Sequence, residues 1–269
     1  MSGEPVLLAF YFVLLAGIGL IVGSFLNVVI HRVPLGQSVI HPRSACPSCG
    51  TSISPRDNIP VLSWLLLRGT CRTCRTAIPG RYPAVELATS AVWLALGWWA
   101  LTGTDIDPLL PLLLVLGSAG LSLAVIDLEH HRLPNSVVLP LYPVTVLGLI
   151  LAGLISGEWP VVPAIGGAVV WVIVIGGIWL LTSGRGMGLG DVKLAPVLGA
   201  TLGWVSFGSS LVGLFAAFVL GAGVGVALMV AGRASRRSHL PFGPFLLVGA
   251  AIGLAAGAQI AADYVDRVT

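Results

Sequence analysis

The chain has 269 residues, of which 56% are hydrophobic and only 9% are charged, and its mean hydropathy is +0.98. About a quarter of the residues of a soluble domain are charged, because its surface must face water. The composition therefore excludes a soluble globular protein and indicates helices that face lipid. The net charge of +3 excludes little by itself, and the distribution of the charges is more informative.

Stretches of nearly 20 apolar residues recur along the chain, about the length that a helix needs to cross a bilayer. Glu4 precedes the first stretch, and His31 and Arg32 follow it. This charge order is the reverse of a secretory signal, so we expect an uncleaved anchor with its N-terminus outside. We predict an all-α polytopic membrane protein with about eight transmembrane helices, at residues 6–30, 84–101, 109–126, 137–155, 161–181, 194–206, 209–231 and 245–262.

Lysine and arginine residues gather on one side of this topology. Alternating spans place residues 31–83, 127–136, 182–193 and 232–244 in the cytoplasm, and these segments hold 13 of the 14 Lys and Arg residues. Only Arg267 lies outside. Cytoplasmic loops of membrane proteins carry an excess of Lys and Arg, so the charges favour the predicted orientation. The cytoplasmic set is Arg32, Arg43, Arg56, Arg68, Arg72, Arg75, Arg81, Arg132, Arg185, Lys193, Arg233, Arg236 and Arg237.

All four cysteines lie in the large loop between the first two spans, as the pairs Cys46 with Cys49 and Cys71 with Cys74. Two such pairs, 21 residues apart, are typical of a tetrahedral zinc site with four thiolate ligands. Disulfides need an oxidising compartment, and the charges place this loop in the reducing cytoplasm. We therefore predict zinc, with disulfides and then free thiols as the alternatives.

An ion with four protein ligands has no open position for a substrate, so the predicted role of the zinc is structural. The loop is too small and too rich in proline to bury much core alone, and a metal explains how it could hold a shape. A folded cytoplasmic cap is the default interpretation of this loop. A binding or catalytic role is the alternative.

Two aspartates end up on the same side of the membrane. Asp127 follows the third span and Asp191 follows the fifth, and two crossings return the chain to the same face. Ionisable residues at the lipid boundary are costly and are functional candidates. The alternatives are a helix cap or an interfacial anchor for each residue alone, and a proton or ion pathway for the pair.

A pair of close carboxylates in a site of low dielectric cannot both ionise, so they share one proton. The ionised member can take a proton from water that attacks a carbonyl, and the protonated member can donate to the carbonyl oxygen. Since the pair titrates jointly, neither residue is assigned one role. The glycines before Asp191, among them Gly188 and Gly190, predict a loop that accepts φ > 0 and lets a substrate segment approach closely.

These residues belong to an ordered set of motifs along nearly the whole chain. The set resembles the bacterial type IV prepilin peptidases of the bifunctional leader peptidase/N-methyltransferase type, which are membrane aspartyl proteases with a Gly-x-Gly-Asp motif. The motifs are Gly23 to Asn27 with His31, Arg32 and Pro34; Cys46 to Gly50; Asp57 to Pro60; Ser63-Trp64; Cys71 to Cys74; Arg81-Tyr82-Pro83 with Glu86-Leu87; Asp127 to Pro134; Gly188 to Lys193; and Pro241 to Phe245.

The resemblance implies an eight-span fold in the bacterial inner membrane and a catalytic pair at Asp127 and Asp191. It implies cleavage of the leader of type IV prepilins or pseudopilins after a glycine, on the cytoplasmic side, and no nucleic-acid partner. The bifunctional members then methylate the new N-terminus with S-adenosylmethionine. The chain would divide into a first helix at 1–30, a zinc-binding and methyltransferase loop at 31–83, and a peptidase domain at 84–269.

Two residues are our candidates for the methyl-donor site, Asn27 and Glu86, since they are polar groups where spans meet the cytoplasmic loop. Capping or helix-contact roles are the alternative for both. One departure from the family pattern is Asn135, because family members commonly carry an acid directly after the proline of the first aspartate loop. Asp127 itself is in place, so this departure affects the predicted pair little.

Two other classes of protein compete with the peptidase. A proton- or ion-coupled transporter would use Asp127 and Asp191 as relay carboxylates. Such proteins often show inverted repeats and acids near the middle of the bilayer. Here both acids lie at one face, and the sequence shows no convincing repeat. A membrane scaffold with a zinc-stapled loop for a partner would explain the cysteines. It would leave the glycine-rich loop and the second aspartate without a purpose.

Overall fold

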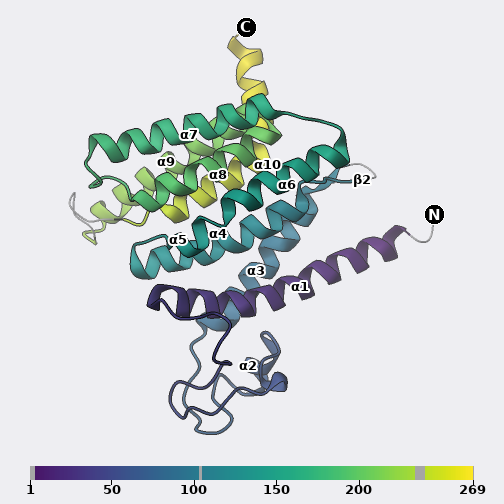
Figure 1. Cartoon of the computed structure of the whole chain (residues 1–269), viewed down its shortest axis with the longest axis vertical. Helices are drawn as coiled ribbons and strands as arrows, with labels where there is room; N and C mark the ends of the chain where they lie inside the picture. Colours follow the sequence, from purple (N-terminus) through teal and green to yellow (C-terminus); the bar gives the residue numbers. More distant parts are fainter. Residues whose placement is uncertain (1–3, 103–104, 234–239, 269) are drawn as a thin grey trace. The chain divides into compact units, whose positions relative to one another are not determined.

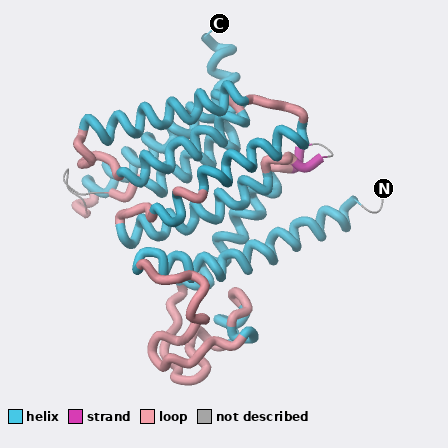
Figure 2. Tube along the Cα trace, viewed as in Figure 1, coloured by secondary structure: helices cyan, strands magenta, loops and turns pink. Residues whose placement is uncertain are grey.

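The computed structural model describes residues 4–102, 105–233 and 240–268. Apart from the cysteine loop these residues are mostly α-helical, and the chain forms two compact units, Met1–Ser122 and Leu123–Thr269. Arg236 and Arg237, which we predicted to be cytoplasmic, lie outside the described residues. Figure 2 shows that loops make up most of the segment that carries the cysteines, whereas helices dominate elsewhere.

In the first unit, helix α1 (Glu4–Arg32) packs against α3 (Arg81–Trp99), as Figure 1 shows. The cysteine loop connects them and contains two 3-10 turns, η1 (Val33–Leu35) and η2 (Pro55–Asp57), and the short helix α2 (Leu62–Leu66). Strands β1 (Leu101–Thr102) and β2 (Asp105–Ile106) then form an antiparallel pair, and α4 (Leu110–His130) begins in this unit.

Small residues allow α1 and α3 to approach closely. A Cβ atom added at Gly19 would lie 2.8 Å from Cα of Ser90, and one at Gly23 would lie 2.6 Å from Cα of Glu86. Such contacts are typical of helix pairs in membranes, where close van der Waals packing replaces the hydrophobic driving force. The position of Glu86 beside α1 is therefore set by backbone contact.

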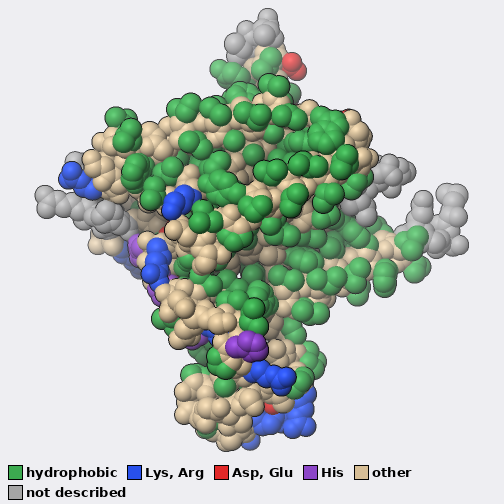
Figure 3. Space-filling view, viewed as in Figure 1, with side chains coloured by type: hydrophobic (Ala, Val, Ile, Leu, Met, Phe, Trp, Pro, Cys, Tyr) green, Lys and Arg blue, Asp and Glu red, His purple; other side chains and the backbone are tan. Residues whose placement is uncertain are grey.

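The second unit contains the last turns of α4, then α5 (Asn135–Val138), α6 (Leu141–Ser156) and α7 (Val161–Leu181). Helices α8 (Leu189–Val205), α9 (Phe207–Val230) and α10 (Gly243–Val268) complete it. Glycines again mark the closest approaches, since Gly167 of α7 lies against Gly199 of α8, and Gly213 of α9 lies against Gly249 of α10. Hydrophobic side chains cover most of the face of α7 that Figure 3 shows.

Six helical stretches in the described part of the chain are long and apolar enough to cross a membrane: Pro5–Leu35, Leu110–His130, Asn135–Ser156, Val161–Leu181, Phe207–Val230 and Gly243–Arg267. These six candidates coincide with six of the predicted spans and support a helical, multi-pass membrane protein. The other two predicted spans, 84–101 and 194–206, coincide with α3 and α8, which do not meet these limits. The total of eight spans and the outer N-terminus remain predictions.

Two details differ from the expected boundaries. The predicted span 137–155 is interrupted, because α5 ends at Val138 and Pro140 precedes α6. Helix α8 begins at Leu189, before the predicted start at residue 194, so Asp191 is part of its first turn. The predicted assignment of the methyltransferase to residues 31–83 and of the peptidase to residues 84–269 remains a prediction. The two compact units are defined by packing and do not show which residues carry which activity.

Candidate active site

Asp127 is buried in the last turn of α4, with 5% of its surface exposed. Its Oδ2 atom accepts a hydrogen bond of 3.0 Å from the backbone N–H of Gly243, the first residue of α10. A Cβ atom at position 243 would lie 2.8 Å from this oxygen. Only a residue without a side chain fits there, which gives the motif from Pro241 to Phe245 a structural reason that the sequence alone did not reveal.

Asp191 is the third residue of α8 and is also buried, with 6% of its surface exposed. Its Oδ2 atom accepts a hydrogen bond of 3.0 Å from the backbone N–H of Gly188, as an acid at this position of a helix commonly does. Its other oxygen, Oδ1, is buried without a hydrogen-bond partner among the described residues. The helix cap that we weighed against catalysis thus accounts for one oxygen only.

Both aspartates line one cavity of about 540 Å³. Leu133 also lines it and contacts both sides of the site: a Cβ atom at Gly190 would lie 2.7 Å from Cβ of Leu133, and one at Gly243 would lie 3.3 Å from its Cδ2. Leu133 lies within the motif from Asp127 to Pro134, but the sequence does not single it out, because an apolar residue beside Pro134 is unremarkable in a membrane protein. The volume is within the usual range of ligand pockets.

The glycine-rich loop only partly follows the prediction. Gly184 has φ of +74°, whereas Gly188 has φ of −76° and Gly190 is helical. At Gly190 the missing side chain lets the segment after α4 approach α8. The loop still lines the cavity from residue 184 to Asp191, so its predicted contact with a substrate remains open.

The four cysteine sulfurs form a second candidate site, in the first unit. All four lie within 4.8 Å of one another, and the Sγ atoms of Cys46 and Cys74 are 3.7 Å apart. An ion with Zn–S bonds of about 2.3 Å in a tetrahedron requires sulfurs about 3.8 Å apart. All four thiols are free, so the cluster fits a metal ion and does not contain the alternative disulfides.

The two cysteine pairs have the same local geometry. The N–H groups of Cys46 and Cys71 donate to the carbonyls of Thr51 and Thr76, both at 2.9 Å. The Thr76 hydroxyl lies 3.3 Å from Sγ of Cys74, and hydrogen bonding to the side chain and backbone of Thr76 lowers the pKa of Cys74 to about 6. A lowered pKa favours the thiolate, the form that binds metals.

Asn27 and Glu86 line a third cavity, of about 310 Å³, within the first unit. The amide of Asn27 donates to the carbonyl of Tyr82 at 3.0 Å, while its buried Oδ1 has no hydrogen-bond partner in the described part of the chain. Glu86 Oε2 accepts a hydrogen bond of 2.7 Å from the N–H of Val61. Both residues therefore make structural contacts, as the helix-contact alternative predicts. The unpaired Oδ1 of Asn27 leaves a ligand role open.

The fold and these sites define a multi-pass membrane protein with a buried carboxylate pair and a four-cysteine cluster. Residues 18–100 match the bacterial peptidase A24 N-terminal domain, and residues 114–226 match the type IV leader peptidase family. With this match and with relatives that cover nearly its whole length, the chain belongs to the type IV leader peptidase family.

Several relatives carry the name prepilin leader peptidase/N-methyltransferase. The protein of Aeromonas hydrophila is 36% identical over 96% of this chain and 94% of its own length. That of Burkholderia pseudomallei (strain 1026b) is 38% identical over 88% of this chain and 82% of its own length. That of Pseudomonas aeruginosa is 35% identical over 93% and 91%. No solved structure matches the chain significantly.

Proposed function

We propose that this protein is a membrane aspartyl endopeptidase that cleaves the leader of type IV prepilins or pseudopilins at the cytoplasmic face of the inner membrane. The observation that carries the proposal is the burial of Asp127 and Asp191 in the wall of one cavity. Family membership and the names of the relatives support the substrate class.

In the proposed reaction, one proton is held between the two carboxylates, because two close charges are unfavourable in a shielded site. The ionised carboxylate takes a proton from water as the water oxygen attacks the scissile carbonyl carbon. The protonated carboxyl donates to the carbonyl oxygen. The other carboxyl then passes the proton it took from water to the amide nitrogen as the C–N bond breaks, and the first carboxylate takes back a hydroxyl proton of the intermediate. The backbone N–H groups of Gly188 and Gly243 orient one oxygen of each carboxylate.

The test is cleavage of a purified prepilin-like substrate by Asp127→Asn and Asp191→Asn variants. Asparagine keeps the size of the side chain and an acceptor for the N–H bond, so the variants should fold. Each is expected to lose activity by about a thousandfold or more, because neither can hold the shared proton. Asp263→Asn changes an exposed aspartate of α10 and serves as the control. Wild-type cleavage by Asp191→Asn would rule out the carboxylate pair.

We also propose that the protein methylates the new N-terminus with S-adenosylmethionine, and that Asn27 and Glu86 contribute to the site of the methyl donor. When bound, this cofactor supplies a methyl group from its sulfonium. The unpaired Oδ1 of Asn27 offers an acceptor, and the carboxylate of Glu86 offers a charge that could attract the amine or the sulfonium. Both residues line the cavity beside the cysteine loop, which the resemblance associates with this activity.

Mass spectrometry of the cleaved substrate, with and without added S-adenosylmethionine, tests the second activity. A Glu86→Gln variant keeps an acceptor for the N–H of Val61 and removes only the charge. We expect it to cleave normally and to methylate at least tenfold more slowly, because a charged contact contributes more than a neutral one. Normal methylation would remove Glu86 from the proposed site. Absence of methylation by the wild type would remove the activity itself.

We propose zinc as the ion of the cysteine cluster, with Cys46, Cys49, Cys71 and Cys74 as its ligands and a structural role. The spacing of the four sulfurs supports a tetrahedral ion. Elemental analysis should find one zinc per chain, and a Cys46→Ser variant should bind less. A wild-type protein purified without metal would refute the site. Cleavage of the prepilin is a separate readout, so failure here would leave the peptidase proposal intact.

The orientation of the chain completes the proposal, with eight spans and the N-terminus outside. The distribution of Lys and Arg supports it. Fusions of a periplasm-active reporter after Arg267 and after Arg185 test it: the first should be active and the second inactive. The opposite pattern of reporter activity would show that the topology is inverted and that the carboxylates lie at the other face of the membrane.

A further inference from the structure

The short helix α2 in the cysteine loop presents an apolar outer face. Leu62, Leu65 and Leu66 lie at the spacing of one helical face, and each is exposed, Leu66 to 74%. Ile59, one turn before them, is exposed to 46%. Three leucines on one exposed face, with an exposed isoleucine just before the helix, are unusual for a polar loop and usually mark a contact with another apolar surface.

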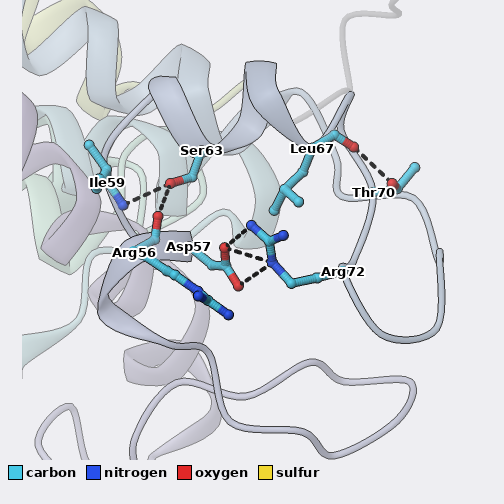
Figure 4. A network of polar contacts seen from close by, with 7 residues as sticks. All are labelled: Arg56, Asp57, Ile59, Ser63, Leu67, Thr70 and Arg72. Carbon is cyan, nitrogen blue, oxygen red and sulfur yellow. Dashed lines mark hydrogen bonds and ion pairs between the residues drawn. The ribbon is translucent and has the colours of Figure 1, made fainter.

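The inner face of α2 is fixed by polar contacts, as Figure 4 shows. The Ser63 hydroxyl accepts a hydrogen bond from the N–H of Ile59 at 3.0 Å and donates to the carbonyl of Arg56 at 2.9 Å. On the other side, the Trp64 indole donates to the carbonyl of Ile78 at 3.0 Å. Because Ser63 and Trp64 face the loop, the leucines cannot turn inward without breaking these bonds.

The depth of α2 follows from its attachment to the helices. Val61, directly before α2, donates its N–H to Glu86 at 2.7 Å, and Glu86 lies against Gly23 of α1. At about 1.5 Å per residue, Gly23 lies about 13 Å along the helix axis before Arg32, where α1 ends. Helix α1 belongs to a candidate membrane span. The start of α2 is therefore level with the span itself rather than beyond its end.

The neighbouring residues fit a boundary between lipid and water. Leu87, next to Glu86 on α3, is 53% exposed, so the helix that holds α2 also presents an apolar side chain outward. Arg68, two residues after α2, is exposed and has a long side chain that can reach lipid headgroups while its stem lies along apolar surface. An apolar face with a basic residue at its edge is typical of helices that lie in the membrane interface.

We propose that α2 is an interfacial helix that inserts Leu62, Leu65 and Leu66 into the bilayer leaflet on the side where α1 ends at Arg32. The bilayer is the occupant that these contacts favour, because α2 begins beside Glu86 and Gly23, and Gly23 lies within a candidate membrane span. The contact would hold the cysteine loop against the membrane surface. This proposal does not depend on either enzymatic activity.

Photo-crosslinking in lipid nanodiscs of phosphatidylethanolamine and phosphatidylglycerol tests the proposal. A diazirine amino acid replaces Leu66, and in the control protein it replaces Ser48, an exposed residue between two cysteines. We expect the yield of lipid adducts at position 66 to be at least about fivefold higher than at position 48, since only an interfacial helix meets acyl chains. Equal yields would overturn the proposal. So would adducts to a second copy of the chain in place of lipid.

A second variant tests the same contact without a crosslinker. Leu65→Gln combined with Leu66→Gln changes only the outer face, so the zinc content should stay at the wild-type value. In nanodiscs, trypsin should cleave after Arg68 at least about threefold faster in this variant than in the wild type. A helix that leaves the interface exposes the peptide bond after Arg68 to the protease. An unchanged rate, with unchanged zinc content, would contradict the insertion of α2.

Discussion

The side-chain amine of Lys193 donates a hydrogen bond of 2.9 Å to Oδ1 of Asn135. Lys193 is on α8, two residues after Asp191, and Asn135 begins α5 after the segment that carries Asp127. The hydroxyl of Tyr142 on α6 donates to the backbone carbonyl of Lys193 at 2.7 Å. The first bond ties the segments of the two aspartates together, the second holds α6 against α8, and both lie outside the lining of the cavity.

An Asn135→Leu variant is expected to lower kcat by about tenfold with little change in KM, because the lost bond positions a carboxylate and does not bind substrate. Asn135→Asp should keep kcat within about twofold of the wild type, since a carboxylate accepts a charge-assisted bond from Lys193. Steady-state cleavage of a prepilin-like substrate separates the two constants. Ser136→Leu, at the exposed neighbouring position, is the control. A wild-type kcat in Asn135→Leu would show that the bond has no positioning role.

Gly243→Ala is expected to reduce cleavage by about a hundredfold, because a displacement of about 1 Å at a reacting group can have this effect. The added Cβ would lie 2.8 Å from Oδ2 of Asp127 and 3.3 Å from Cδ2 of Leu133. The carboxylate would have to rotate away from the N–H that holds it. The measurement is the rate of prepilin cleavage at saturating substrate.

The control for this variant is Gly223→Ala on α9, where an added Cβ would meet no atom within 4 Å. It should cleave at the wild-type rate and should be no less stable. If Gly243→Ala cleaves as fast as Gly223→Ala, the hydrogen bond from Gly243 to Asp127 does not orient the carboxylate.

The sequence predicted the features that depend on composition and local spacing. Apolar stretches predicted the helices, and the spacing of Cys46 to Cys74 predicted the sulfur cluster. The parity of the spans placed Asp127 and Asp191 at one face, and the structure adds that they line one cavity. The sequence could not predict the bond from Gly243 to Asp127, because 116 positions separate the two residues. It also missed α2, whose five residues are too few for a helical period to appear.

The two cysteine pairs have matching geometry, which predicts opposite effects on metal binding for substitutions at the residue that follows each pair. Gly50 follows Cys49 with φ of +68°, and Arg75 follows Cys74 with φ of +60°. Gly50→Val should weaken metal binding by about 1–2 kcal/mol, about tenfold, because a β-branched residue is strained at this φ. Arg75→Gly should bind the metal at least as well as the wild type, since it relieves the same strain. Competition with a zinc chelator measures both. Weaker binding by Arg75→Gly would show that the arginine side chain matters more than its backbone.

The contact between Gly23 and Glu86 predicts a loss of stability when the glycine gains a side chain. A Cβ atom at position 23 would lie 2.6 Å from Cα of Glu86, which is backbone and cannot rotate away. Helices α1 and α3 would have to separate, at a cost of about 1–3 kcal/mol. Gly17→Ala, with no atom within 4 Å of the added Cβ, should be neutral or stabilising, because alanine favours a helix over glycine. Thermal unfolding in detergent compares the two, and a Gly23→Ala variant as stable as Gly17→Ala would mean that the two helices are not held by this contact.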